Sequence, residues 1–178
     1  ASKEKIELCY QQYKTGNNMT DVISALSLLS DVNCEQRDNA LDEFYRKWKH
    51  EHLVVNKWLT IHASSILPGT FNKVKALMSH ESFDIKNPNK VRAMIGGFAM
   101  NRLQFHEPKG SGYTFLADRI LQLDPMNPQI AARLIANLIN YKKFDINRKE
   151  LIEKELVRIG NADKISKDVG EIVAKSLN

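Results

Sequence analysis

The dipeptide His-Glu, which could supply a zinc ligand beside a general base, occurs three times in this sequence, beginning at His50, His80 and His106. A zinc hydrolase helix of the H-E-x-x-H kind needs a second histidine four residues after the first, because that spacing places both imidazoles on one helix face. None of the three dipeptides is followed by that second histidine. His50 and His52 flank Glu51, but a spacing of two points their rings to different faces. We therefore interpret the histidines as surface and core residues, with no metal site in this chain.

Other catalytic patterns are also missing. There is no G-x-S-x-G nucleophile elbow, and Gly110-Ser111-Gly112 is interpreted as a turn. Neither a Walker A sequence nor G-x-G-x-x-G occurs, so a nucleotide phosphate has no evident cradle. Cys9 and Cys34 are too few for a metal cage and are interpreted as reduced thiols, with a single bridge between them left open. The chain is expected to contain no complete catalytic site.

Length and composition indicate one soluble domain. The chain has 178 residues, 43% of them hydrophobic and 26% charged, with a net charge of +5. No apolar run approaches the roughly 20 residues that span a bilayer, and no secretory signal pattern opens the chain, so we predict a cytoplasmic protein without a membrane partner. Lys and Arg alternate with Asp and Glu, which argues mildly against a nucleic-acid partner. The missing initiator Met favours a piece of a longer polypeptide.

Helical periodicity runs through the whole sequence. Apolar residues recur at i, i+3, i+4 and i+7, as in Val55, Trp58, Leu59 and His62, and again in Val91, Met94, Ile95 and Phe98. No segment alternates apolar and polar residues for long enough to predict a strand. The sequence therefore predicts an all-α fold, with Trp48 and Trp58 as core anchors and Met94 and Met100 filling gaps in the core.

Helix starts can be located as well. Asn87-Pro88 and Asn127-Pro128 each place a capping amide before a proline at the first helical position. Thr20 and Ser111 are predicted to cap helices in the same way. The connections are short, so neighbouring helices are expected to pack antiparallel.

A weak internal repeat sets the expected architecture. The Asn-Pro word recurs 40 residues apart, each time before an apolar helix that carries an arginine, Arg92 or Arg133. This period suits antiparallel helix pairs stacked into an α-α superhelix of the HEAT or armadillo kind. Coincidence is the alternative, because Asn-Pro is a common helix cap. Gly96-Gly97 inside a helical pattern predicts either a close helix crossing or the close approach of another domain.

Several distinctive short sequence motifs occur in the order and spacing that they have in a known family. They are Ser82-Phe83, Asn87-Pro88-Asn89-Lys90-Val91-Arg92, Ile95-Gly96-Gly97-Phe98, Phe105-His106, Gly110-Ser111-Gly112-Tyr113, Asn127-Pro128-Gln129 and Arg133-Leu134-Ile135. On these words the chain resembles the helical C-terminal domain of bacterial M1-family aminopeptidase N. The likeness covers nearly the whole chain, more loosely before about residue 18 and after about residue 150.

The resemblance implies a role without catalysis. Enzymes of this family are zinc aminopeptidases that remove N-terminal residues from peptides, and their H-E-x-x-H catalytic domain precedes the C-terminal helices. That catalytic domain is absent here, so residues 1–178 are expected to form the single C-terminal domain of a longer aminopeptidase, with zinc held only in the catalytic domain. The domain would close over the active site, line the peptide chamber and gate access, with the catalytic domain and peptide substrates as partners.

Three residues match cavity positions of that family. Gln129 matches a residue that reaches the pocket for the substrate's first side chain, Arg133 matches a cavity-facing arginine, and Arg92 is a less specific match for the same chamber. Gln129 and Arg133 are four residues apart, so both can face one cavity. A guanidinium suits a peptide carboxylate, although each arginine could instead pair with a nearby Asp or Glu.

One alternative function remains open at this stage. The chain could be a stand-alone HEAT-like scaffold that binds an acidic protein or a nucleic acid through its net positive surface. Salt-dependent binding to nucleic acid would favour that hypothesis.

Overall fold

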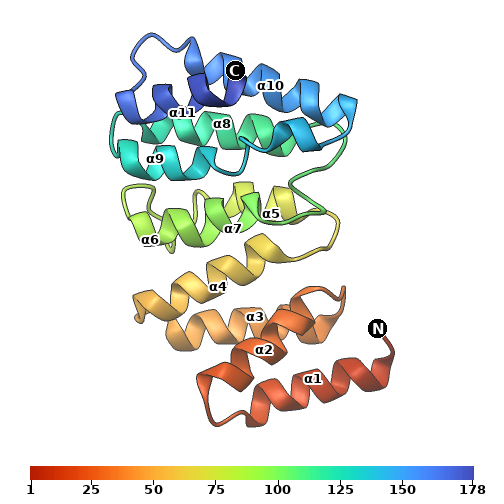
Figure 1. The fold of residues 1–178 in the computed structure, drawn as a ribbon. Coiled ribbons are helices and arrows are strands. Elements are labelled where there is room, and N and C mark those ends of the chain that lie inside the picture. Colours follow the sequence, from red (N-terminus) through yellow and green to blue (C-terminus); the bar gives the residue numbers. More distant parts are fainter.

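The computed structural model describes residues 1–178 and contains helices and turns without any strand (Figure 1). The α-helices are Lys3–Thr15 (α1), Met19–Ser30 (α2), Glu35–Trp48 (α3), His52–Ser64 (α4), Thr70–Leu77 (α5), Pro88–Val91 (α6), Gly97–Ala99 (α7), Ser111–Leu123 (α8), Pro128–Ile135 (α9), Ile146–Gly160 (α10) and Lys167–Leu177 (α11). A π-helical turn, η1 (Arg92–Gly96), joins α6 to α7, and a 3-10 turn, η2 (Tyr141–Lys143), precedes α10. The prediction of an all-α fold is confirmed.

The helices alternate between two layers of an elongated stack. Helix α3 packs on α1, and α10 packs on α8, which defines one layer. In the other layer α4 packs on α2, η1 and α7, and α11 packs on α9. Successive helices run in opposite directions, except that α6, η1 and α7 form one continuous segment. The stack rises from α1 at the bottom to α10 and α11 at the top (Figure 1). These are the stacked antiparallel helix pairs that the sequence repeat predicts.

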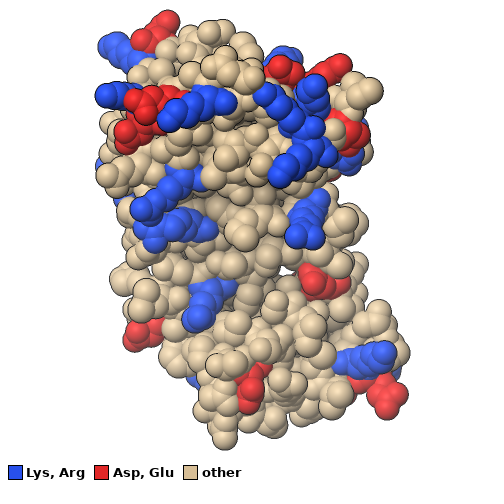
Figure 2. Space-filling model, viewed as in Figure 1, with Lys and Arg blue, Asp and Glu red and all other residues tan.

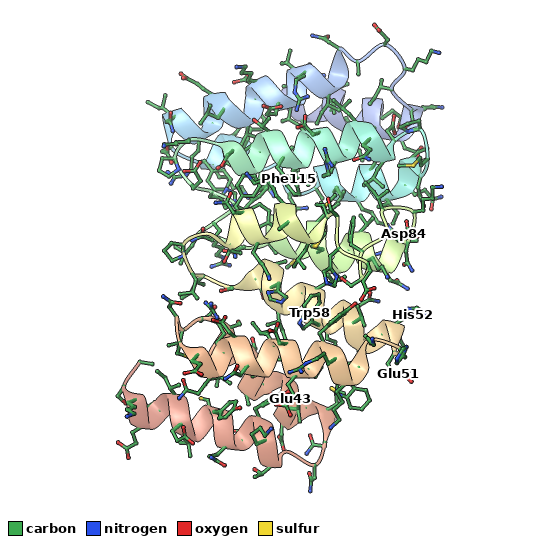
Figure 3. All side chains as sticks on the ribbon, turned by 180° about the vertical axis from the view of Figure 1, so that it is seen from behind. Glu43, Glu51, His52, Trp58, Asp84 and Phe115 are labelled. Atoms are coloured by element: carbon green, nitrogen blue, oxygen red, sulfur yellow. The ribbon has the colours of Figure 1, made fainter.

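One hydrophobic core runs along the whole stack. It comprises 37 buried residues, from Tyr13 in α1 to Val173 in α11. Trp58 lies at its middle (Figure 3), 4% exposed, and its indole N–H donates to the carbonyl oxygen of Leu41 at 3.1 Å. Trp58 is thus the core anchor that the sequence predicts, whereas Trp48 is only partly buried against the core.

An aromatic cluster joins the segment from α5 to α7 to helix α8. Phe98 of α7 lies with its ring centroid 5.2 Å from Phe71 of α5, 5.8 Å from Phe115 of α8 and 5.8 Å from Phe105. Most of these contacts are edge-to-face, the arrangement that ring quadrupoles favour. The cluster makes the two halves of the stack one continuous core.

The predicted asparagine caps are confirmed, and two other predicted caps are wrong. The Asn87 side chain accepts from the N–H of Asn89, and the Asn127 side chain accepts from the N–H of Ile130. Helix α2 is capped by Asn18, which lies one residue before the helix start, so Thr20 falls inside the helix. Helix α8 has Gly110 at its cap with a positive φ of 72°, so Ser111 is already its first helical residue.

The segment after α6 departs from a regular α-helix. Residues Arg92–Gly96 form a π turn, and a Cβ built on Gly97 would lie 3.4 Å from the Cβ of Ala63 in α4. The close helix crossing therefore explains this glycine. Met94 is fully buried as predicted, but Met100 is 77% exposed, so its predicted place in the core is wrong. Met100 follows the last helical turn and points away from the stack.

Candidate functional site

An apolar groove of about 270 Å³ lies between the starts of α6 and α9. Six side chains give it its apolar wall: Ile85, Pro88, Val91, Leu123, Met126 and Ile130. In Figure 1 α9 lies above α6 on the same side of the stack. The groove thus joins two elements that are 40 residues apart in the sequence.

The repeated Asn-Pro word explains why both helices begin here. Each asparagine side chain accepts from a backbone N–H of the first helical turn, and each proline occupies a first-turn position where no N–H is needed. The two helices therefore start at equivalent levels of successive repeats. Val91 and Ile130, each two or three residues into its helix, turn inward and line the groove.

Two of the predicted residues lie together on α9. Gln129 and Arg133 are both exposed, and four residues separate them, so they share one face of the helix. Neither side chain forms a hydrogen bond or an ion pair within the chain. The alternative of a structural ion pair for Arg133 is therefore not realised.

Arg92 follows α6, and none of the three predicted residues Arg92, Gln129 and Arg133 lines the groove itself. Arg92 is the first residue of η1, it is exposed, and its Nη1 donates to the side-chain oxygen of Asn89 at 2.9 Å. This partner is a neutral amide on the same helical turn, so the positive charge of Arg92 is not neutralised by a carboxylate. Arg92 follows the groove residue Val91, and Gln129 precedes the groove residue Ile130.

These side chains can bind but cannot transfer protons. A guanidinium stays charged at any physiological pH and donates through a planar fork, while an amide offers one donor group and one acceptor. Lys86 adds a positive charge to the groove wall, and no Asp or Glu lines it. The arrangement suits a ligand that combines an apolar part with a carboxylate or a carbonyl.

The fixed ion pairs lie elsewhere in the stack. Arg158 of α10 bonds Glu155 at 2.6 Å and Asp118 of α8 at 2.8 Å, and Arg148 bonds Asp145 at 2.7 Å. On the face drawn in Figure 2, Lys and Arg side chains are scattered, with Asp and Glu among them in the upper part. That face carries no continuous basic stripe of the kind that tracks a nucleic-acid backbone.

The side chains of this chain do not form a metal centre. No group of three His, Cys, Asp or Glu residues is close enough to hold a metal ion. His52 and Glu51 lie at the exposed start of α4 (Figure 3), away from the groove. None of the helices has the length and apolar character that crossing a membrane requires.

The apolar wall was not identified from the sequence. Met126, 47% exposed, lies in the turn before Asn127, and Ile85 lies in the turn before Asn87. The signal that could have found them is the paired Asn-Pro word itself, because equivalent helix starts in stacked repeats bring their preceding turns close together.

Comparison with known proteins gives the chain its family. The family model described as "Domain of unknown function (DUF3458_C) ARM repeats" matches residues 1–178. Aminopeptidase N of Haemophilus influenzae is 39% identical over 171 residues, which cover 96% of this chain and 20% of that relative. Aminopeptidase N of Escherichia coli is 37% identical over 171 residues, with the same coverage of both chains. The chain thus spans about a fifth of the length of these relatives.

A solved structure shows the same fold. Legionella pneumophila aminopeptidase A, crystallised in complex with aspartic acid, superposes with a TM-score of 0.91 at 38% sequence identity, over 98% of this chain and 21% of that one. The resemblance to the C-terminal region of aminopeptidase N is thereby confirmed over nearly the whole chain. The chain belongs to the DUF3458_C ARM-repeat family, the helical domain found in aminopeptidase N.

Proposed function

We propose that this chain is the C-terminal, non-catalytic domain of a zinc-dependent aminopeptidase that removes N-terminal amino acids from peptides. In this proposal residues 1–178 form one domain that closes over the active site of a preceding catalytic domain. The groove between α6 and α9 lines the peptide chamber and filters what enters. Gln129 reaches toward the substrate's first side chain, and Arg133 and Arg92 hold its carboxylate or carbonyl groups.

The main support is the pair of free polar groups on α9. An exposed arginine without any partner inside its own domain is available to an external carboxylate, and Gln129 stands one helical turn away on the same face. The relatives in which this domain occurs are aminopeptidases, and the domain makes up about a fifth of each. A peptide chamber needs apolar surface for side chains and donors for the peptide backbone, and the groove offers both.

Zinc, in this proposal, is held outside the chain. The donor side chains here do not gather into a set that fits the ion, so no residue of the stack is assigned to it. The expected contribution of this domain is to position the peptide and exclude water around a reaction carried out by the catalytic domain. The two cysteines are free thiols, which is consistent with an enzyme that works in the reducing cytoplasm.

The decisive experiment begins with the reading frame upstream of the Ala1 codon. The proposal expects an open frame of several hundred codons that encodes H-E-x-x-H and a further zinc-binding Glu. The complete polypeptide should release N-terminal residues from short peptides, and the 178-residue chain alone should not. A frame without a peptidase motif, together with salt-dependent nucleic-acid binding by this chain, would overturn the proposal in favour of a HEAT-like scaffold.

A further inference from the structure

A second cavity, of about 380 Å³, opens where α3, α4 and α5 meet, on the opposite edge of the stack from the α6–α9 groove. Its volume falls in the range of small-molecule sites, roughly 300–1,000 Å³. Its walls differ from those of the groove, because only two of its twelve lining residues are hydrophobic. Walls of this kind would bind a polar ligand more favourably than an apolar one.

The imidazole of His62 in α4 is one of the buried polar groups that line the cavity. The residue is 9% exposed, and neither ring nitrogen forms a hydrogen bond within the chain. Its Nε2 atom is buried and without a partner. Burial, reinforced by the positive charges of Lys73 and Arg37, lowers the pKa of His62 to about 3, so the ring is neutral at physiological pH. A neutral imidazole offers one donor and one acceptor. Leaving the buried Nε2 unused is costly, whereas Nδ1 is not among the buried unpartnered atoms and can bond a ligand.

One wall of the cavity attracts negative charge. Helix α5 begins beside it with Gly69 as its cap, and no side chain caps the helix. The N–H groups of Phe71 and Asn72 have no acceptor, although these two residues do not line the cavity themselves, and the first turn holds no acidic residue. Lys73 stands in that first turn, lines the cavity and forms no ion pair. A lysine beside the positive end of a helix is unfavourable unless an anion is present, so this end of the cavity suits a carboxylate.

The facing wall, on α3, carries negative charge. Asp38 is already paired, because its Oδ1 accepts from Nε of Arg37 at 2.9 Å and from Nη2 at 2.7 Å. Asp42, one turn further along α3, lines the cavity and has no cationic partner. The Arg37–Asp38 pair is neutral as a unit, so the cavity keeps one free positive group, Lys73, and one free negative group, Asp42, on different helices.

We propose that this cavity is a binding site for a small zwitterion, a free α-amino acid. The ligand carboxylate lies at the start of α5 beside Lys73, its ammonium group lies toward Asp42, and the ring of His62 donates or accepts at the buried end. The ligand class follows from the charges and the volume of the cavity alone. It does not depend on the proposed peptidase role, so either proposal can fail without the other.

Isothermal titration of the 178-residue chain with each of the free L-amino acids tests the site. At least one of them should bind with a Kd below about 10 mM. The N-acetyl derivative of the best ligand has lost the ammonium group, and its amide has lost the carboxylate. Each derivative should bind about tenfold more weakly or worse, because each leaves one charged wall unpaired.

Two variants map the site and two serve as controls. Lys73→Met and Asp42→Asn should each weaken binding about tenfold. Lys164→Met and Asp163→Asn alter the same residue types at exposed positions in the turn before α11 and should leave the Kd unchanged. All four positions are exposed, and circular dichroism of each variant checks that the helices are retained.

Three results would overturn the proposal. The first is the absence of binding by any free amino acid up to about 10 mM. The second is binding that Lys73→Met and Asp42→Asn do not change, which would put the ligand elsewhere. The third is undiminished binding of the N-acetyl derivative, which would show a simple anion site in place of a zwitterion site.

Discussion

The hydroxyl of Thr60 in α4 lies 3.1 Å from the carbonyl oxygen of Ala93, inside the π turn that joins α6 to α7. A π turn shifts the backbone hydrogen bonds from i+4 to i+5, and side chains commonly take up the carbonyl groups that it displaces. The same hydroxyl also lies 3.0 Å from the carbonyl oxygen of Asn56 in its own helix. Thr60 thus ties the distorted segment to α4 at the residue that follows Arg92.

Replacing Thr60 with Val should weaken this tie while keeping the shape of the side chain. We expect the free energy of unfolding to fall by about 1 kcal/mol, the usual net value of one hydrogen bond. Thr20→Val is the matched control, because Thr20 lies exposed on α2 and its hydroxyl forms no bond. Urea unfolding of both variants measures the difference. Equal stability of the two variants would show that the Thr60 hydroxyl does not hold the π turn.

The two adjacent glycines of this segment should respond in opposite directions. A side chain at Gly97 would meet α4, since its Cβ would already lie 3.4 Å from that of Ala63. We expect Gly97→Leu to lower the free energy of unfolding by roughly 1–3 kcal/mol through overpacking. At Gly96 the nearest atom to a new Cβ is 4.0 Å away, so Gly96→Ala should raise it by up to about 1 kcal/mol. Thermal unfolding of both variants checks the signs, and a stable Gly97→Leu would contradict the crossing.

How far the sequence predicts this structure differs from element to element. Helical periodicity and the Asn-Pro caps are local signals, and the helices, their antiparallel stacking and the caps at Asn87 and Asn127 are confirmed. Thr20 failed as a cap because Asn18, a stronger cap, lies within reach of the N–H of Asp21. Ser111 failed because Gly110 adopts the positive φ that ends the preceding turn.

Features that depend on tertiary packing could not be predicted from the sequence. The π turn arises where a helix must accommodate Thr60 and Ala63 of a helix more than 30 residues away. The exposure of Met100 follows from where α7 stops, which its own hydrophobicity does not reveal. For the candidate site, the spacing of Gln129 and Arg133 predicts a shared face, but the groove beside them needs two repeats to be stacked.

Gly112 is expected to tolerate no side chain at all. A Cβ built on it would lie 2.3 Å from the carbonyl oxygen of Phe105, a distance at which the backbone itself must move. Gly112→Ala should therefore lower the free energy of unfolding by at least about 2 kcal/mol. Gly170→Ala is the control, since its new Cβ would lie 3.6 Å from Ile165 in ordinary contact inside α11. Chemical unfolding of both variants decides the matter, and similar stabilities would show that the turn before α8 can relax.

His62 should make the stability depend on pH below neutrality. Burial, with the charges of Lys73 and Arg37, holds its folded-state pKa at about 3, whereas the unfolded value is near 6.5. Between these values the unfolded chain binds a proton that the folded chain does not, so stability is full above about pH 6.5 and falls as the pH is lowered. Between pH 7 and pH 5 the loss from His62 should be about 2 kcal/mol.

Urea unfolding of the native chain and of His62→Gln at pH 7 and pH 5 isolates this contribution. The variant can differ in stability at both pH values, but the drop between them should shrink by about 2 kcal/mol. The drop that remains includes His106, whose pKa is also lowered by burial and by Arg148. An unchanged drop in the variant would show that His62 is hydrated or paired in solution.

Arg133 provides the test of substrate binding in the complete polypeptide. If its free guanidinium holds the C-terminal carboxylate of a short peptide, Arg133→Met should raise KM for a tripeptide by roughly tenfold or more with little change in kcat. The same tripeptide carrying a C-terminal amide has no carboxylate to lose, so its KM should change far less. Arg102→Met is the matched control, because Arg102 is also exposed but lies in the turn after α7 and not on α9. Steady-state kinetics with both peptides separates the roles: an equal loss for acid and amide would indicate a structural role for Arg133, and no loss for either would remove it from the chamber.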